Sequence, residues 1–301
     1  MAIEYTLART VPKPWGVLDL RPYSNLRNDG NAIGEIWYER SCDDAADPAL
    51  LLKLLFTTQP LSIQVHPDDA HAQSIGLRSG KTEAWYVLNA TPGAKIALGL
   101  KERVTPQQLR ASIDDGSIAN LVAWHSVSAG DVVSVPGGTI HAIGAGLIIA
   151  EIQQRSDATF RLFDYGRQRD LHVESAVAAA DTGSAHFPEE TLRFTSERTL
   201  LAASSNFVLE RIELIQNSAW SLEAERETWL LILSGNAHAA SFDIAVGDAI
   251  FAQSDRLDIC VGPTGMVGLV AYTGGDAVPD LLRRISRSNA TDKNSLREVP
   301  V

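Results

Sequence analysis

The sequence predicts a mainly β protein made of two barrel units with a small helical insertion. Short apolar or alternating runs, bounded by Gly, Pro, Asp or Asn, recur between residues 50 and 281, and this pattern is typical of a β-barrel or a β-sandwich. Two short motifs from the first half of the chain are echoed in the second half, which indicates a duplicated unit. One stretch near residues 104–122 breaks the alternation and indicates the helical insertion.

The expected strands follow one another with turn residues between them. Thr105 and Pro106 interrupt them with an N-cap and a first helical residue, so a helix begins there. A second interruption, over residues 170–180, ends in an alanine-rich stretch of high helix propensity. The clearest strand candidates are 82–88, 96–99, 131–135, 147–153, 207–214 and 229–233.

The echoed motifs divide the chain into two domains. Residues 227–235 and 245–251 resemble residues 83–89 and 129–135, so we assign a first domain to residues 1–200 and a second to residues 201–282. The second domain has no histidines comparable to those of the first, and we expect it to bind no metal. Residues 283–301 are polar with little periodicity, and we expect them to form a flexible tail.

Composition and charge restrict the classes of function. Of the 301 residues, 45% are hydrophobic and 21% are charged, which are globular values. No apolar run approaches the roughly 18 residues of a membrane span, and the first residues lack the pattern of a signal peptide, so we expect a cytoplasmic protein with no membrane partner. Cys42 and Cys260 are far apart and form no disulfide framework or thiolate metal site. The net charge of −11 disfavours nucleic acid, but a small anion can bind where a few cations converge.

Two histidines lie at strand ends in a pattern that suits a metal site. Residues two apart in a strand share a face, so Gln64 and His66 point the same way. Pro67 and the aspartates after it end that strand, and a Pro-Gly-Gly turn ends just before His141. A carboxylate at Glu83 would complete a set of nitrogen and oxygen donors suited to zinc or a similar divalent ion.

Several uncommon motifs occur in an order that resembles type I mannose-6-phosphate isomerase. They lie within residues 12–175 and comprise residues 13–16, 34–37, 61–69, 80–86, 130–136, 138–142 and 151–161. This family is a zinc-dependent branch of the cupin superfamily. The resemblance implies a mainly β fold of two cupin (jelly-roll) barrels, in agreement with the duplication.

The resemblance also implies an activity and a set of site residues. The activity is the interconversion of mannose 6-phosphate and fructose 6-phosphate through an enediolate, with zinc or another divalent metal, one per chain, and a small-molecule sugar phosphate as the ligand. Residues 1–200 would then be the catalytic, metal-binding domain. The implied metal ligands are Gln64, His66, Glu83 and His141. The implied sugar phosphate site is lined by Ser62, Lys81, Glu151, Arg161 and Arg167.

Glu151 and Lys81 are the two candidates for proton transfer. Glu151 follows the apolar run 147–150, where desolvation raises the pKa of a carboxyl group towards neutrality. The alternative is that Glu151 pairs with Arg155 or Arg161 and only orients it. Lys81 is the second candidate because a lysine near a metal loses its proton more easily than one in water, whereas a lysine that contacts phosphate stays charged.

Arg161 is the candidate for binding the phosphate or an enediolate oxygen. Its apolar neighbours in the run 160–163 would hold the side chain in place, and a guanidinium can grip such a group through two parallel hydrogen bonds. The alternative is a surface arginine paired with Asp157 or Asp164. Arg167 and a further arginine follow closely, so positive charge accumulates locally in this acidic chain.

Two other functions stay open on the sequence alone. Histidines and a carboxylate in a small barrel also suit non-haem iron, so a cupin dioxygenase is one alternative. A non-catalytic sugar-binding cupin that kept its metal is the other. No feature of the sequence indicates an oligomeric state.

Overall fold

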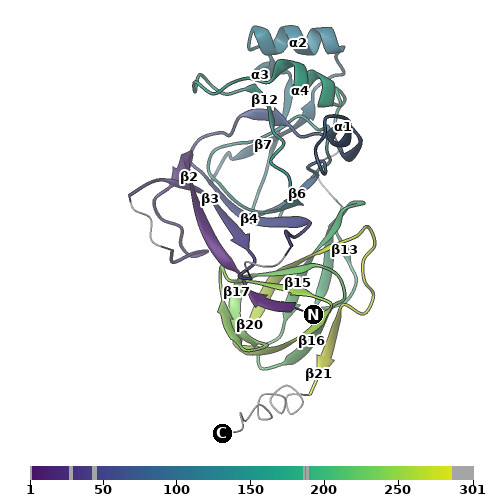
Figure 1. The fold of residues 1–301 in the computed structure, drawn as a ribbon. Helices are drawn as coiled ribbons and strands as arrows, with labels where there is room; N and C mark the ends of the chain where they lie inside the picture. Colours follow the sequence, from purple (N-terminus) through teal and green to yellow (C-terminus); the bar gives the residue numbers. More distant parts are fainter. Residues whose placement is uncertain (1, 27–29, 43–45, 186, 188–189, 287–301) are drawn as a thin grey trace.

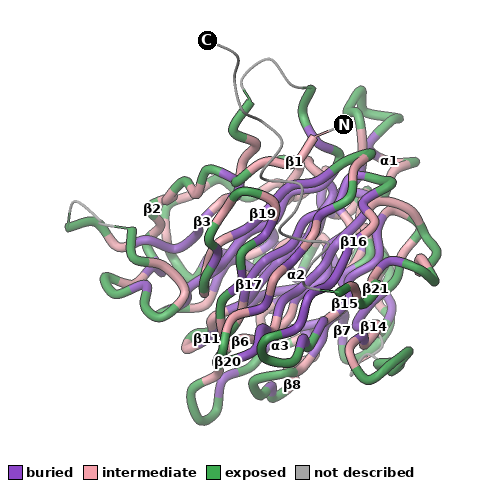
Figure 2. Tube along the Cα trace, turned by 90° about the horizontal axis from the view of Figure 1, so that it is seen from below, coloured by how far each residue is buried: buried purple, intermediate pink, exposed green. Residues whose placement is uncertain are grey.

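The computed structural model has two β-barrels stacked along one axis, with helices at one end (Figure 1). It describes residues 2–26, 30–42, 46–185, 187 and 190–286. The mainly β fold with a small helical insertion is confirmed. Buried strands run through the middle of the molecule, and exposed segments lie at its periphery (Figure 2). None of the helices within the described ranges has the length and apolar character to cross a bilayer.

The first barrel consists of two facing antiparallel sheets. One has six strands in the order β2-β3-β4-β11-β6-β9, and the other has five in the order β12-β5-β10-β7-β8. The strands are β2 (Leu7–Val17), β3 (Ile33–Glu39), β4 (Leu50–Thr57), β5 (Ile63–Val65), β6 (Glu83–Ala90), β7 (Lys95–Leu100), β8 (Val122–Ser126), β9 (Val132–Val135), β10 (His141–Ile143), β11 (Leu147–Gln154) and β12 (Phe160–Phe163).

The four helices are α1 (Asp69–Ser74), α2 (Pro106–Asp114), α3 (Ile118–Leu121) and α4 (Val173–Ala179). Three of them, α2, α3 and α4, cover the outer face of the five-stranded sheet. Thr105 caps α2 in a capping box with Gln108, so this helix begins where the sequence predicts. Ile63 and Val65 of β5 join α2 and α4 residues in one buried cluster. Their neighbours in the alternation, Gln64 and His66, therefore face the barrel interior.

The second barrel is a single ten-stranded sheet. Its strands are β1 (Ala2–Tyr5), β13 (Leu192–Arg193), β14 (Arg198–Ala203), β15 (Phe207–Leu214), β16 (Ala219–Ala224), β17 (Thr228–Ala239), β18 (Phe242–Ala245), β19 (Ala249–Gln253), β20 (Asp255–Thr273) and β21 (Leu282–Ile285). β1 pairs with β19, so the N-terminal strand belongs to this sheet.

The expected tail from residue 283 is wrong at its start, because β21 (Leu282–Ile285) pairs with β16. That pairing gives the backbone of these arginine-rich residues hydrogen-bond partners that a loose tail would lack. The rest of the expected tail, residues 287–301, lies outside the described residues. The division between domains at residue 200 stays a prediction, and β1 (Ala2–Tyr5) and β13 (Leu192–Arg193) pair with strands of the second barrel.

The echo between the two halves extends to individual side chains. Trp85 on β6 faces Val133 of β9, and Trp229 on β17 faces Phe251 of β19 in the same way. Each indole donates a hydrogen bond to a glutamate two residues earlier, with Trp85 Nε1 at 3.2 Å from Glu83 and Trp229 Nε1 at 3.0 Å from Glu227.

β4 serves both barrels because its side chains alternate between two buried faces. Leu52, Leu54 and Phe56 point towards the second barrel and join its residues, including Trp229 and Phe251, in one apolar cluster. The residues between them point into the first barrel. All eight residues of β4 are buried, so neither face of this strand meets solvent.

Glu227 fastens the entry of β4 to the second barrel. Its carboxylate accepts hydrogen bonds from the backbone N–H groups of Ala49, at 2.6 Å, and Leu50, at 2.8 Å. The carboxylate that corresponds to Glu83 in the duplicated unit therefore binds the backbone of the first barrel.

Replacing Leu54 by Ala should lower the free energy of unfolding by about 2–5 kcal/mol, because Leu54 is fully buried between the barrels and the change leaves a cavity. Urea denaturation measures this loss. Leu192→Ala is the matched control, since that side chain is 57% exposed. An equal loss in both variants would contradict the assignment of Leu54 to a shared core.

Glu4 links β1 to the segment after β3. Its carboxylate accepts hydrogen bonds from the guanidinium of Arg40 and from the N–H groups of Ser41 and Cys42. Burial raises the pKa of Glu4, but the hydrogen bonds and charge of Arg40 outweigh it and lower the pKa below its ordinary value of 4.5. This ion pair stabilises the fold when Glu4 is ionised.

Replacing Glu4 by Gln should cost about 1.5–3 kcal/mol near neutral pH. Because the pKa is depressed in the folded state, the stabilisation is complete above the unfolded pKa and is lost as pH falls. The difference in free energy of unfolding between wild type and variant should therefore shrink between about pH 7 and about pH 3. Urea titrations at both pH values test this, with the exposed Glu225→Gln as control. A difference that is constant with pH would exclude the ion pair as its source.

Candidate metal centre

Three strands bring His66, Glu83 and His141 together inside the first barrel. His66 follows β5, Glu83 begins β6 and His141 begins β10, where it pairs with Gln64 across the sheet. The three side chains are buried, and their ligand atoms all lie within 4.8 Å of one another. This group can hold a divalent metal ion.

Both imidazoles are oriented as metal ligands. His66 Nδ1 donates to the carbonyl of Ala158 at 2.7 Å, and His141 Nδ1 donates to the carbonyl of Thr139 at 2.9 Å. Since a carbonyl can only accept, each Nδ1 carries the proton and each Nε2 is an unprotonated acceptor that can bind a metal. Burial lowers the pKa of His66 to about 3 and also lowers that of His141. Both rings are therefore neutral at pH 7, as metal binding requires.

Gln64 lies beside this group, and both the oxygen and the nitrogen of its side-chain amide contact neighbouring side chains. Its Oε1 accepts from Ser62 Oγ at 3.0 Å, and its Nε2 lies 3.3 Å from His141 Nε2. Rotating the amide by half a turn would present Oε1 to the centre and Nε2 to Ser62, which conserves the hydrogen bond to the hydroxyl. Gln64 can thus supply a fourth donor atom.

Lys81 provides the positive charge next to Glu83. Its Nζ lies 2.9 Å from Glu83 Oε1 and 3.1 Å from His66 Nε2. Burial lowers the pKa of Lys81, but the charges of Glu83 and Glu151 outweigh it and raise the pKa overall. Burial raises the pKa of Glu83, but the charge of Lys81 outweighs this effect and lowers the pKa well below its ordinary value. Lys81 is therefore held as a cation, which disfavours it as the base.

Glu151 lies opposite Trp85 and Lys53 in the six-stranded sheet. It accepts a hydrogen bond from Trp85 Nε1 at 3.0 Å and lies 3.2 Å from Lys53 Nζ. The alternative that Glu151 pairs with Arg155 or Arg161 is wrong, because the described side chains pair it with Lys53 instead. Burial, followed by the charge of Glu83, raises the pKa of Glu151.

Sequence reasoning missed a second layer of charges on β2, β3 and β4. Glu35 pairs with Lys13 at 3.1 Å and accepts from Trp37 Nε1 at 2.6 Å. Lys53 donates to Gln153 at 2.5 Å in addition to its contact with Glu151. The signal that could have found Lys53 is its place as a lone cation in the apolar run 50–56.

Most of these residues line a cavity of 370 Å³ in the first barrel, whereas His66 and His141 are not part of its wall. The predicted residues Ser62, Lys81, Glu151 and Arg161 all belong to its wall, together with Gln64 and Glu83. Trp15, Asp157, Arg169 and His172 line it as well, although none of them is among the site residues that the sequence predicts.

Arg161 and Arg169 lie at the cavity, and Arg167 does not. Arg161 donates to the carbonyl of Asp170 at 2.8 Å, and its Nε is buried without a hydrogen-bond partner among the described residues. Asp164 pairs with Arg169 and Arg167 rather than with Arg161. Arg167 also donates to the carbonyl of Pro60 at 2.9 Å, which directs it away from the cavity.

Comparison with known proteins finds close relatives of one kind. The mannose-6-phosphate isomerase of Streptococcus mutans is 43% identical over 140 residues, a match that covers 44% of each chain. The probable mannose-6-phosphate isomerase GmuF of Bacillus subtilis is 30% identical over 223 residues, which cover 69% of this chain and 70% of that protein. The match thus spans less than half of the Streptococcus protein. No protein-family model matches the chain.

Solved structures agree with this assignment at the level of the fold. The crystal structure of the mannose 6-phosphate isomerase from Bacillus subtilis superimposes with a TM-score of 0.77 at 22% identity, over 90% of this chain and 100% of that one. A zinc-bound mannose 6-phosphate isomerase superimposes with a TM-score of 0.71 at 12% identity, over 91% of this chain and 100% of that one. With its long match to GmuF and this fold, the chain belongs to the mannose-6-phosphate isomerase family.

Proposed function

We propose that this protein is a metal-dependent isomerase that interconverts mannose 6-phosphate and fructose 6-phosphate. The observation that carries the proposal is one cavity whose wall includes Glu83 of the metal-binding group, the buried carboxylate of Glu151 with its raised pKa, and Arg161, whose Nε has no partner among the described residues. These are the groups that aldose–ketose isomerisation needs. The names of the relatives support the same substrate pair.

The metal in this proposal is zinc, one ion per chain. Two imidazoles, a carboxylate and the amide of Gln64 form a donor set suited to zinc, and a zinc-bound relative of the same fold supports the choice. When bound, the ion would polarise the sugar carbonyl as a Lewis acid. Lys81 keeps its charge beside Glu83 and adds a second positive group towards the developing oxyanion.

Glu151 is the proposed base that carries the proton between the two carbons. Its environment raises the pKa, which makes the carboxylate a better proton acceptor near neutral pH. Trp85 and Lys53 hold one carboxylate oxygen each, so the group has a fixed orientation. A base positioned in this way typically contributes a factor of about 100 to 10,000 in rate.

Arg161 and Arg169 are the proposed phosphate-binding pair. Both line the cavity, and the buried Nε of Arg161 has no partner within the described part of the chain. Ser62 adds a hydroxyl on the same wall. Arg167 would act through Asp164, whose carboxylate it shares with Arg169, and so position Arg169.

The dioxygenase and the binding-only alternatives make different predictions. A dioxygenase would consume oxygen, and a binding module would hold the sugar phosphate without turnover. Family membership and the proposed proton transfer by Glu151 favour the isomerase over both alternatives.

Purified protein should convert mannose 6-phosphate to fructose 6-phosphate in a coupled assay, lose this activity on chelation and regain it with added zinc. His141→Ala should abolish both metal content and turnover, because it removes one of the two imidazole donors. His238→Ala is the matched control, since His238 lies in the second barrel paired with Asp243 at 2.9 Å. Full turnover by metal-free protein would overturn the proposal.

Glu151→Gln should lower kcat by about 100- to 10,000-fold while metal content stays unchanged, because the amide keeps the shape but cannot accept the proton. Metal analysis and steady-state kinetics measure the two effects separately. The exposed Glu102→Gln serves as control. A variant that keeps wild-type kcat would exclude Glu151 as the base.

A further inference from the structure

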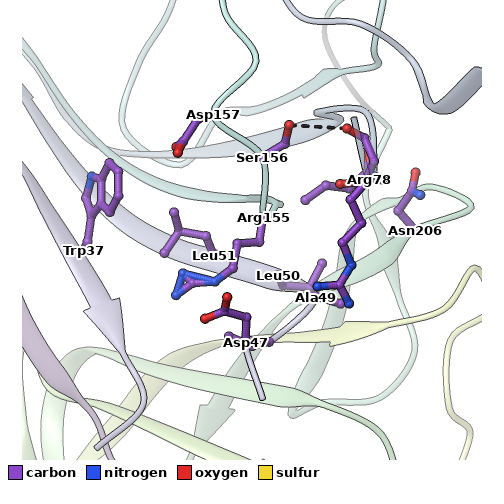
Figure 3. Close-up of a pocket in the computed structure, with 13 residues that line it drawn as sticks. Trp37, Asp47, Ala49, Leu50, Leu51, Arg78, Arg155, Ser156, Asp157 and Asn206 are labelled. Carbon is purple, nitrogen blue, oxygen red and sulfur yellow. Dashed lines mark hydrogen bonds between the residues drawn. The ribbon is translucent and has the colours of Figure 1, made fainter. Parts of the chain in front are cut away.

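A second cavity of 480 Å³ opens where the two barrels meet (Figure 3). Its wall is formed by the entry to β4 at residues 47–51, the segment after α1 at residues 78–79, the end of β11 with residues 155–157, and Asn206 between β14 and β15. Trp37, Ser156 and Asp157 line this cavity and the metal cavity alike. The two spaces are therefore neighbours separated by one loop.

Two arginines in this wall, of which Arg78 is exposed, have no partner among the described residues. Among the arginines in the described ranges, every other guanidinium makes an ion pair, a hydrogen bond or a ring contact. Arg78 and Arg155 make none within those ranges. The Nε of Arg155 is closed off from solvent as well. A buried N–H without a partner costs free energy, and an acceptor that enters the cavity can satisfy it.

The rest of the wall resembles a carbohydrate site. The carboxylates of Asp47 and Asp157 form no ion pair with any described residue, and both side chains are exposed. Figure 3 shows Arg155 and Arg78 reaching into the cavity from two sides with Asp47 near them, while Asp157 lies by Trp37. Carboxylates accept hydrogen bonds from sugar hydroxyls.

Charge balance identifies the class of ligand. A simple anion on the two arginines would also meet the two carboxylates and be repelled by them. A phosphorylated carbohydrate satisfies both kinds of group, because its phosphate pairs with guanidinium groups and its hydroxyls donate to carboxylates. We propose that this cavity is a second binding site, in which Arg78 and Arg155 hold the phosphate of a phosphorylated carbohydrate and Asp47 and Asp157 bind its hydroxyls.

The loop between the two cavities connects this site to the metal centre. Arg155 donates its backbone N–H to the carbonyl of Ala49 at 2.8 Å. Three residues later, the carbonyl of Ala158 accepts the hydrogen bond from His66 Nδ1 at 2.7 Å. A ligand bound to Arg155 would therefore contact the same short loop that orients the imidazole of His66. Binding in this cavity depends on its own lining residues and not on turnover at the metal centre.

Isothermal titration of the metal-loaded full chain with fructose 6-phosphate tests the proposal. We expect two binding sites per chain in the wild type. The double variant Arg78→Gln with Arg155→Gln should keep one site and lose the other, with affinity there reduced by about 10- to 100-fold for each arginine removed. The control Arg193→Gln with Arg226→Gln changes the net charge equally, at arginines that donate only to backbone carbonyls, and should keep two sites.

The variant His141→Ala separates this proposal from the isomerase proposal. It disrupts the metal centre, so one fructose 6-phosphate site should remain, and adding the Arg78→Gln and Arg155→Gln changes should remove it. Retention of that second site in a protein without turnover would leave the inference standing while the isomerase proposal fails. Two results would overturn the inference of a second site. One is a single wild-type site that His141→Ala abolishes, and the other is a double arginine variant that still binds two equivalents.

Discussion

Strand β4 in the six-stranded sheet of the first barrel is buried on both faces, and this constraint determines the site. On β4, Leu54 packs into the core shared with the second barrel, and Lys53, one residue away, points into the metal cavity. Because side chains alternate with a period of two, a slip of one residue would exchange these environments. The register that places Lys53 opposite Glu151 is thus the register that buries the apolar face.

Once the cavity is buried, its charges have to balance one another. Each of the three buried carboxylates in the wall lies beside a lysine: Glu83 with Lys81, Glu151 with Lys53, and Glu35 with Lys13. Removing one member of such a pair leaves a charge without compensation in a medium of low dielectric, which costs more than the pair contributes. The tryptophans between these pairs donate hydrogen bonds to the same carboxylates and fix their orientation.

The fold and the residues of the candidate metal centre could be predicted from the sequence because their signals are local. Alternation around Gln64 and the turns beside His66 and His141 are properties of short segments. A lone lysine in the apolar run 50–56 marks Lys53, but its pairing with Glu151 and the role of Glu35 depend on which strands are neighbours, and no short window of sequence contains that information. Arg169 rather than Arg167 lies at the cavity because of the path of a loop in which Asp164 binds Arg169. Strand β1 belongs to the second barrel because it pairs with β19, which lies far along the chain.

Glu227 shows what a duplicated carboxylate can become. It corresponds to Glu83 and keeps the same indole partner, yet it binds two peptide N–H groups at the entry of β4 instead of facing a cluster of imidazoles. The second barrel therefore contributes hydrogen bonds that hold the first barrel in place. A first barrel cut free of it would begin its central strand with two unsatisfied N–H groups and an uncovered apolar face. The two halves of this molecule are consequently one cooperative unit, and neither is a transferable module.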